Sequence, residues 1–370
     1  MISNRAALVA VIIAFVFGLG GSLAVRPPGT SPAAPQNTAA DSQAQRRINW
    51  RVPITFATNM PVLGEAATYL AEQVQQITNG GVNLQLFEPG EIVPPFSITD
   101  AVRDGKVEAG YTWLGYDQGK IPSAALLAAT PFGLEPWEYM GWWYEGGGRE
   151  LAEQLYRPHQ IMPLFCGLIG PETAGWFRQP LQSLDDIKGL KIRFAGLGGK
   201  VFERAGASVT MLPGGEIFQA LEKGAIDATE YSLPIVDQAL GFARIAKNNY
   251  FPGWHQPFTA SHLAVNLDVW NSLPASDQAL LATTCEATVL RNLAASEGRQ
   301  GAVIAGFPAL GVTARYLSMD ILRELQRLTE QVLDEEAAKN QDFREILQSQ
   351  RDFATQYAHW KRLAYLPRDF

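Results

Sequence analysis

From Trp50 onward, short apolar runs alternate with longer stretches in which apolar residues recur every three or four positions. Short apolar runs are typical of strands, and the longer spacing is typical of amphipathic helices. Strands are predicted at Val52 to Thr58 and at Val82 to Phe87. A helix is predicted between them, ending at Asn79-Gly80-Gly81, and its apolar face carries Ala67, Leu70, Val74 and Ile77. This β-α-β pattern, continued along the chain, predicts an α/β fold.

A weak internal repeat indicates two related lobes. Residues 101–109 match residues 220–228 at an offset of 119. Each copy predicts the end of a helix, a glycine in a left-handed turn, and the start of a short strand. The strands would contain Gly110-Tyr111-Thr112-Trp113 in one copy and Thr229-Glu230-Tyr231-Ser232 in the other. Two lobes with equivalent strand ends could face one cleft, although shared helix-to-strand chemistry alone could also produce this match.

Two apolar runs are expected to cross between the lobes. They are Pro163 to Pro171 and Tyr250 to Trp254. On this division lobe 1 contains residues 49–168 together with about 257–300, and lobe 2 contains residues 169–256.

The C-terminal segment, residues 301–370, is predicted to contain a long helix capped by Ser318. Its apolar positions recur at helical spacing: Ile321, Leu322, Leu325, Leu328 and Val332, followed by Phe343, Ile346, Leu347, Phe353, Tyr357 and Trp360. Such a stripe must be buried. It could dock across both lobes or pack against a second subunit, and the spacing alone favours neither.

The N-terminus carries an export signal. Arg5 precedes the apolar segment Ala6 to Val25, and Ser22-Leu23-Ala24 has the small-x-small pattern of a signal-peptidase site. The segment is also long enough to span a bilayer as an uncleaved anchor, so residues 1–25 are predicted to be a signal peptide or an anchor. The Pro-rich residues 26–48 are predicted to be a flexible linker. We therefore expect a periplasmic protein, cleaved or membrane-anchored.

Composition narrows the choice of partner. The 370 residues are 47% hydrophobic and 18% charged, with a net charge of −7. This length can bury a substantial core, and no basic run could follow a phosphate backbone. We therefore expect no nucleic-acid partner. The two cysteines, Cys166 and Cys285, lie far apart without a histidine cluster, so no zinc spacing exists. The spacing permits a disulfide between them but does not establish one.

Enzyme signatures are not found in the sequence. It contains no G-x-S-x-G, H-E-x-x-H or C-x-x-C motif. Gly196 to Lys200 resembles a phosphate loop, but Val201 stands where Ser or Thr is required. Glu172 and Glu230 could form a pair of hydrolytic carboxylates, yet no pattern sets their separation. A hydrolase is therefore a minor alternative to a binding protein.

Arg193 ends a run in which Leu190, Ile192 and Phe194 alternate as in a half-buried strand. Alternation places Lys191 and Arg193 on the opposite face, where a solvated charge is the simpler interpretation. A guanidinium at this position could also hold a carboxylate through two parallel hydrogen bonds.

Arg193 lies in one of several segments that together resemble a known protein family. Several segments, in order, carry the resemblance: Phe87-Glu88-Pro89-Gly90, Gly110-Tyr111-Thr112-Trp113-Leu114-Gly115-Tyr116, Gly170-Pro171-Glu172-Thr173-Ala174-Gly175-Trp176-Phe177, Gly189-Leu190-Lys191-Ile192-Arg193, Pro213-Gly214-Gly215-Glu216-Ile217 and Pro252-Gly253-Trp254-His255-Gln256. The chain resembles, from about Trp50 to its C-terminus, the solute-binding subunits of tripartite ATP-independent periplasmic (TRAP) transporters. The resemblance is strongest to the branch that binds 2-oxo acids such as pyruvate.

The resemblance implies two α/β lobes that close on a small carboxylate ligand held by Arg193. In that branch a sodium ion binds with the substrate, and its ligands fall on Glu230, Tyr231 through its carbonyl group, and Gln256. All are oxygen donors, as a hard cation requires. Thr173 would hydrogen-bond the substrate, with Glu172 adjacent. The segment Gly110, Tyr111, Thr112 would close the pocket from the first lobe, and Trp113, Trp176 and Trp254 suggest that the pocket is small.

Two departures keep alternatives open. Relatives more often carry an amide near Thr173, which leaves the register between Glu172 and Thr173 undecided, and they often carry Trp where Tyr231 stands. Calcium with a hydroxy acid such as lactate is therefore the alternative to sodium with pyruvate, and a sensory ligand-binding module is a further one. The resemblance also implies membrane transport subunits as partners and a homodimer formed through the long C-terminal helix.

Overall fold

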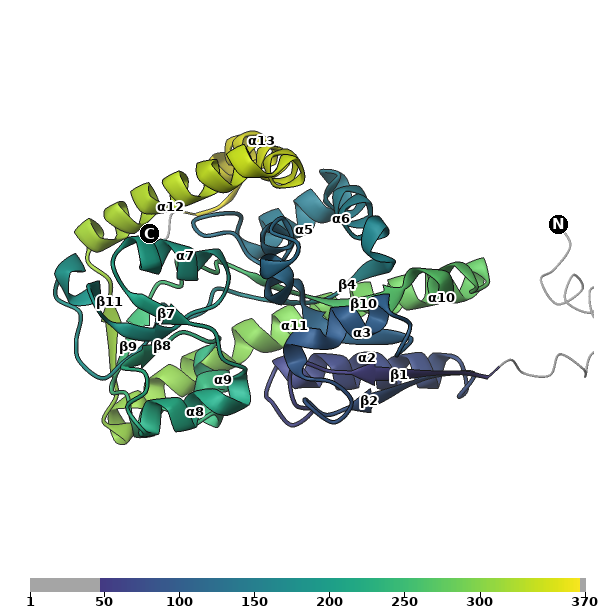
Figure 1. Cartoon of the computed structure of the whole chain (residues 1–370), viewed down its shortest axis with the longest axis horizontal. Helices are drawn as coiled ribbons and strands as arrows, with labels where there is room; N and C mark the ends of the chain where they lie inside the picture. The colour runs from purple at the N-terminus through teal and green to yellow at the C-terminus, as the bar shows by residue number, and fades with distance from the viewer. Residues whose placement is uncertain (1–46, 367–370) are drawn as a thin grey trace, which may run out of the picture. The chain divides into compact units, whose positions relative to one another are not determined.

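The computed structural model describes residues 47–366, which form a mixed α/β unit containing three hydrogen-bonded sheets (Figure 1). The predicted α/β class is therefore confirmed. The apolar segment Ala6 to Val25 and most of the predicted linker lie outside the described residues. Within residues 47–366, no helix has the length and apolar character needed to cross a membrane.

Four strands of the N-terminal half, together with the later strand β10, form two adjoining sheets. A parallel pair, β1 and β2, adjoins a three-stranded antiparallel sheet in the order β3-β10-β4, and an isolated bridge from Ile54 to Tyr111 links them. The strands are β1 (Ile48–Pro53), β2 (Val82–Phe87), β3 (Ala109–Trp113), β4 (Ile161–Ile169) and β10 (Thr259–Asn266). We call these five strands the first sheet region.

Most helices that precede or follow these strands along the chain are short. They are α2 (Leu63–Ile77), η1 (Pro95–Ser97), α3 (Ile98–Arg103), η2 (Leu114–Gly119), α4 (Ala124–Ala128), α5 (Pro136–Glu145), α6 (Gly148–Tyr156), η3 (Arg157–His159), α10 (Leu267–Asn271) and the much longer α11 (Ala275–Gly306). The sequence correctly predicted α2 and β2. It placed the first strand too late, because the alternation that buries Ile48, Trp50 and Val52 begins before Trp50.

The second sheet has six strands in the order β11-β9-β5-β8-β6-β7. These are β5 (Gly175–Phe177), β6 (Lys191–Arg193), β7 (Ser208–Thr210), β8 (Ala228–Thr229), β9 (Asn248–Phe251) and β11 (Thr313–Tyr316). The helices between them are η4 (Leu184–Ile187), α7 (Gly196–Arg204), α8 (Gly214–Glu222), α9 (Pro234–Ala239), η5 (Phe242–Arg244) and η6 (Phe307–Leu310). Strand β11 comes from the segment that the sequence treated as separate and C-terminal, and it pairs with β9.

The two copies of the internal repeat have the same local geometry. Gly105 follows α3 at φ 66°, and Gly224 follows α8 at φ 70°. In each copy the next amide, of Lys106 or Ala225, donates a 2.9 Å hydrogen bond to the alanine carbonyl five residues earlier. Strands β3 and β8 then begin, one in each sheet system. The repeat therefore marks equivalent helix-to-strand turns.

Helix α11 connects the two halves of the described unit (Figure 1). It packs against β4 and α2, where Cys285 forms a disulfide with Cys166 of β4. Nearer its C-terminus the Gln300 side chain accepts a 3.1 Å hydrogen bond from the Ile235 amide at the start of α9. The sequence left the cysteine pairing open, and the fold brings the two residues together.

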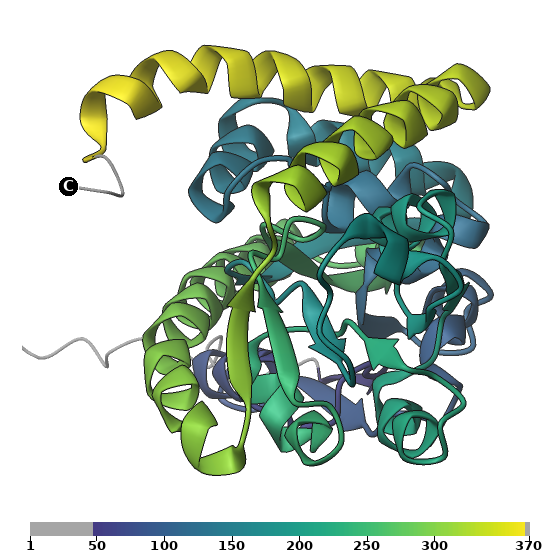
Figure 2. The same ribbon diagram turned by 90° about the vertical axis from the view of Figure 1, so that its left-hand side faces the viewer.

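The C-terminal residues form two helices, α12 (Met319–Lys339) and α13 (Gln341–Ala364), lying along one side of the unit (Figure 2). Ser318 caps α12, as predicted, by accepting a hydrogen bond from the Ile321 amide. Asn340 caps α13, so the single predicted stripe is broken into two helices. Helix α12 packs against α7 and α13 packs against α4, α5 and α6. The C-terminal helices thus pack on helices next to the second sheet and on helices next to the first sheet region.

The lobe boundaries predicted from the sequence stay a proposal. The two sheet systems support it, since the runs around β4 and β9 lie at the points where the chain passes from one to the other.

Candidate ligand-binding site

A small cavity lies where the first sheet region and the second sheet approach each other. Its volume is about 20 Å³, enough for roughly one water-sized group. Residues from both systems line it: Phe56, Leu63, Trp113, Tyr116, Glu172, Arg193, Ala195, Glu230, Tyr231, Gln256 and Thr259. Charged groups in a cavity this enclosed require specific partners.

Arg193 is the positive charge of the cavity. It ends β6, and its side chain is only 1% exposed. Its Nη1 donates to the Glu230 carboxylate (2.9 Å) and to the Glu230 carbonyl (2.7 Å), while Nε donates to the Leu212 carbonyl (3.1 Å). The guanidinium lies 5.1 Å from the centre of the Tyr231 ring. Hydrogen bonds on two sides and an aromatic ring on a third fix its orientation.

Glu230 and Glu172 have opposite electrostatic environments. Burial raises the pKa of Glu230, but the Arg193 charge, His255 and the Ala195 amide together outweigh it, so the pKa is lowered. Burial raises the pKa of Glu172, and the nearby Glu230 charge raises it further. Arg193 therefore neutralises one carboxylate and leaves the other without a cationic side chain in hydrogen-bonding contact.

Glu172 is held by one oxygen only. Its Oε1 accepts a 2.8 Å hydrogen bond from Thr259, whose hydroxyl in turn accepts a 2.7 Å bond from the Gln256 amide nitrogen. In this series of hydrogen bonds the Gln256 NH₂ group donates to Thr259, so the Gln256 amide oxygen is available to another partner. Oε2 of Glu172 is buried without a hydrogen-bond partner.

His255 lies between the two carboxylates. Its Nε2 is 3.5 Å from Glu230 Oε1 and 3.8 Å from Glu172 Oε2, beyond ordinary hydrogen-bond length, and neither ring nitrogen has a hydrogen bond. Burial favours the neutral ring, but the two carboxylates outweigh it and raise the pKa of His255. No role was predicted for His255 from the sequence, because a lone histidine gives no local signal.

Aromatic side chains enclose the remainder of the cavity. Tyr116 and Trp113 meet edge to face with ring centres 4.9 Å apart, and burial raises the pKa of Tyr116 to about 12. These rings exclude water, which strengthens every charge interaction inside. Trp176 and Trp254, also expected near the cleft, lie outside the lining: Trp176 donates to Asp237, and Trp254 stacks on Phe202.

The structure brings together five of the predicted site residues at the cavity: Glu172, Arg193, Glu230, Tyr231 and Gln256. It places the other four, Thr173, Gly110, Tyr111 and Thr112, outside the lining.

Each of these four has a partner elsewhere. Thr173 is fully buried with its hydroxyl 3.4 Å from Asp237. Tyr111 donates to the Cys166 carbonyl, and Thr112 pairs with Thr55. Gly110 packs under Ile98. The segment 110–112 lies within strand β3, as predicted, but it does not line the cavity; only the residues that follow it, Trp113 and Tyr116, reach the cavity.

Sequence reasoning did not assign Phe56, Leu63, Tyr116 and Thr259 to the site. Tyr116 stands in a recognised segment and could have been chosen on that ground. Phe56 and Leu63 carry no local signal that separates them from ordinary core residues.

A strained turn presents Leu63 to the cavity. Val62 has φ 65° and ψ −57°, and the Leu63 amide bonds the Pro61 carbonyl at 2.7 Å. A β-branched residue is disfavoured in this region. Asn292 of α11 donates a 2.9 Å hydrogen bond to the Val62 carbonyl and so fixes the turn. Strain of this kind is often found beside functional sites.

Gly253 permits the close packing that positions Glu172. A Cβ at Gly253 would lie 2.2 Å from the Glu172 carbonyl oxygen, which no real Cβ contact allows. A side chain at this position would displace Glu172 or the loop carrying His255 and Gln256.

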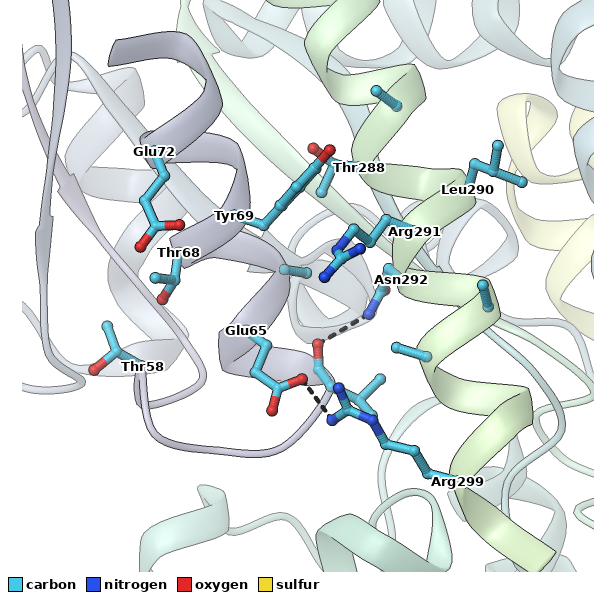
Figure 3. A pocket seen from close by; sticks show the side chains of 15 residues that line it. Thr58, Glu65, Thr68, Tyr69, Glu72, Thr288, Leu290, Arg291, Asn292 and Arg299 are labelled. Carbon is cyan, nitrogen blue, oxygen red and sulfur yellow. Dashed lines mark hydrogen bonds and ion pairs between the residues drawn. The ribbon is translucent and has the colours of Figure 1, made fainter. Parts of the chain in front are cut away.

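A larger cavity, about 830 Å³, lies between α2 and α11 (Figure 3). Both of its arginines already have partners: Arg299 bonds Glu65 at 2.6 Å, and Arg291 lies over the Tyr69 ring at 5.2 Å. It opens to solvent and holds none of the buried charges that distinguish the smaller cavity. Size alone therefore does not make it the candidate site.

The donor atoms of the smaller cavity suit a hard cation. Among the described residues, the carboxylates of Glu172 and Glu230 and the His255 ring form one buried group whose nearest atoms lie within 4.8 Å of one another. With the free Glu172 Oε2 and the Gln256 amide oxygen, the set is mostly oxygen. Carboxylate and amide oxygens are typical ligands of sodium or calcium, not of zinc.

The fold and this enclosed site define a ligand-binding protein, and family comparison agrees. Residues 55–340 match the model of bacterial extracellular solute-binding proteins, family 7 (DctP). The chain belongs to this family, whose members are solute-binding subunits of TRAP transporters, and is therefore an extracytoplasmic transport protein.

Three relatives are informative. A monocarboxylate 2-oxoacid-binding periplasmic protein of Nostoc is 33% identical over 88% of this chain and 90% of its own. A Bordetella bronchiseptica TRAP solute-binding protein, crystallised as a dimer with calcium and picolinate, has a TM-score of 0.84 and 30% identity, covering 86% and 95% of the chains. A Pseudoalteromonas atlantica protein with sodium and pyruvate has a TM-score of 0.83 and 29% identity, covering 86% and 97%.

Proposed function

We propose that this protein binds a small 2-oxo monocarboxylate such as pyruvate, together with a cation, and delivers it to the membrane subunits of a TRAP transporter. The observation that carries this proposal is the enclosed cavity in which one guanidinium, Arg193, faces two buried carboxylates, Glu230 and Glu172. Nothing in this set activates a nucleophile, so we propose a binding role without catalysis.

Arg193 is the anchor for the ligand carboxylate. It is buried and held rigidly by Glu230, Leu212 and Tyr231, so it meets an incoming carboxylate in a fixed orientation. Preorganised charge in a dry cavity binds an anion more strongly than the same group in water.

The two glutamates would repel that anion if nothing offset their charge. A bound cation supplies the missing positive charge between these carboxylates and the ligand. Glu230, the Tyr231 carbonyl and the Gln256 amide oxygen are the proposed ligands of this cation, as the resemblance implies, and Glu172 is placed to add a further oxygen. Cation and acid should therefore bind together.

The lining also restricts ligand size. Phe56, Leu63, Trp113 and Tyr116 come from the first sheet region and face charged groups of the second. With only about 20 Å³ enclosed, even a three-carbon acid requires the two sides to separate for entry. A large sugar acid would not fit without rebuilding this wall.

The direct test is a calorimetric titration after bound ligand has been removed by unfolding and refolding. Pyruvate, longer 2-oxo acids and lactate are titrated with sodium, with calcium, and with neither ion. We expect pyruvate to bind only when a cation is present. Absence of binding under all conditions, or steady turnover of any acid, would reject the proposal; preference for lactate would favour the hydroxy-acid alternative.

We also propose that the protein forms a homodimer through the end of α13. Apolar side chains there are exposed: Trp360 (61%), Leu363 (88%), Tyr365 (53%) and Leu366 (76%). Exposed apolar groups gathered at the end of one helix and in the residues that follow it mark an interaction surface, and the Bordetella relative is described as a dimer.

Sedimentation of a Trp360→Asp/Leu363→Asp variant tests this surface. We expect monomers, whereas the control Ile77→Asp, at a similarly exposed apolar residue (58%) on α2, should leave the dimer intact. A monomeric wild-type protein at working concentration would contradict the proposal.

A further inference from the structure

The buried charges of the small cavity do not balance. Among its lining residues Arg193 is the one cationic side chain, and Glu230 and Glu172 are the acids, all at most 3% exposed. A ligand carboxylate adds a third negative charge to this set. His255 lies between the two acids, but a cation bound to their oxygens offsets the carboxylate charge that favours a protonated ring, so the ring counts as neutral in the ion-bound site. One positive charge then faces three negative ones, which leaves a deficit of two positive charges in this buried site. Asp237, buried behind Thr173, lies outside this lining, and burial raises its pKa well above the usual range of a carboxyl group.

We infer that Glu172 makes this site selective for a divalent cation of the calcium type over sodium, an inference that rests on the proposed function. A divalent ion restores neutrality with all three carboxylates in place. A monovalent ion leaves one uncompensated negative charge, and an uncompensated charge is costly in a buried site.

The geometry of Glu172 supports a role as an ion ligand. Its Oε1 is committed to Thr259 at 2.8 Å, whereas Oε2 is buried without a hydrogen-bond partner. A buried carboxylate oxygen left in this state carries a desolvation cost, which a cation ligand would remove. The Thr259 bond also fixes the direction of the carboxylate, and Gln256 braces Thr259 from the other side.

The second carboxylate is arranged in the same way. Oε2 of Glu230 accepts from Arg193 and from the Ala195 amide, while Oε1 is directed at His255, 3.5 Å away. Each glutamate thus has one oxygen engaged in support and one oxygen in the shared buried group. Two such oxygens, the Gln256 amide oxygen and a bidentate 2-oxo acid approach the six to eight oxygen ligands that calcium takes.

Selectivity follows from charge rather than from the number of oxygens. Glutamine at position 172 would keep a side-chain oxygen at the same reach but remove one negative charge. One positive charge would then face two negative ones in the ligand-bound state, and a monovalent ion would suffice. Glu172 is therefore the residue that sets the valence of the ion.

The test compares wild type with Glu172→Gln after treatment with a chelator. Pyruvate is titrated calorimetrically in calcium, in sodium, and in potassium alone. For wild type we expect at least a tenfold higher affinity in calcium than in sodium. For Glu172→Gln we expect that advantage to disappear, because the affinity in sodium rises once no negative charge is left uncompensated and the affinity in calcium falls. Glu345→Gln, an exposed carboxylate on α13, is the matched control.

A second readout needs no organic ligand. Calcium alone should raise the thermal unfolding midpoint of wild type, because binding to the native state stabilises it, and should have little effect on Glu172→Gln. Glu172→Asp, which keeps the charge, should retain part of the calcium response, and it serves if the Gln variant does not fold.

The outcomes separate the two claims. Equal pyruvate affinity in sodium and calcium, or a calcium advantage that survives in Glu172→Gln, overturns the role of Glu172 and leaves the binding function standing. If pyruvate binds under no condition while calcium still stabilises wild type and not the variant, the proposed ligand is wrong and the ion inference stands.

Discussion

Replacing Arg193 by Met separates the structural work of this residue from ligand binding. Met keeps an unbranched stem of similar reach and removes the charge. Glu230, 1% exposed, would lose its ion pair, and the Leu212 carbonyl would lose its donor. Removing one member of a buried ion pair typically costs about 3–5 kcal/mol, because the remaining charge stays buried and unpaired.

The partner substitution provides the internal control. Glu230→Gln in the Arg193→Met background leaves no unpaired charge, so the double variant should regain about 2 kcal/mol or more of unfolding free energy relative to Arg193→Met. Both variants should lose pyruvate affinity by at least a hundredfold, because neither has the guanidinium that holds the ligand carboxylate.

Urea unfolding at low temperature gives the stability, and calorimetry gives the affinity. The reasoning on the ion pair is refuted if Arg193→Met unfolds within about 1 kcal/mol of wild type, which is the range of an exposed pair. The anchor role is refuted if the affinity for pyruvate is unchanged. The two results are independent, so a stabilising pair without a ligand role would also be recognised.

Three further substitutions have definite expected outcomes. His262 is buried beside the rings of Trp143 and Phe165, and burial lowers its pKa to about 3. The neutral ring therefore makes its full contribution to the free energy of unfolding above the unfolded pKa of about 6.5. This contribution is lost at up to about 1.4 kcal/mol per pH unit as the pH falls toward 3. His262→Phe should therefore flatten the acid limb of the unfolding free energy measured by urea titration between pH 6.5 and about 4, and an unchanged slope would contradict the assignment. Cys166→Ala/Cys285→Ala opens a loop of 119 residues and should cost about 2–5 kcal/mol, after which reductant should have no further effect on the urea midpoint. Asn292→Ala frees the strained turn at Val62 and should weaken pyruvate binding about three- to tenfold by calorimetry, which equal affinity would disprove.

Local patterns in the sequence were sufficient for much of the architecture. Helix α2 and its glycine end, strand β2, and the capped helix starting after Ser318 follow from spacing alone, because hydrogen bonding and side-chain direction repeat within a few residues. The nine-residue repeat identified two equivalent turns for the same reason. The recognised segments then indicated the family, and with it Arg193 and Glu230.

Those local patterns could not predict which residues are buried at the site. Lys191 and Arg193 lie on the same face of β6 by alternation, yet Lys191 is exposed and Arg193 is 1% exposed. The difference arises because the end of β6 lies at the cavity, opposite residues from the first sheet region such as Tyr116. Alternation reports the two faces of a strand but not what covers each face.

The sequence by itself thus determined the α/β class, helix α2, the capped start of α12 and the residue that carries the positive charge. Only the tertiary structure decided that Glu172, Glu230 and His255 form one buried group, that Thr173 turns away to Asp237, and that Cys166 meets Cys285. These residues come from distant segments. Their meeting depends on how the two sheet systems pack, and the charge balance of the site exists only after that packing has removed the water.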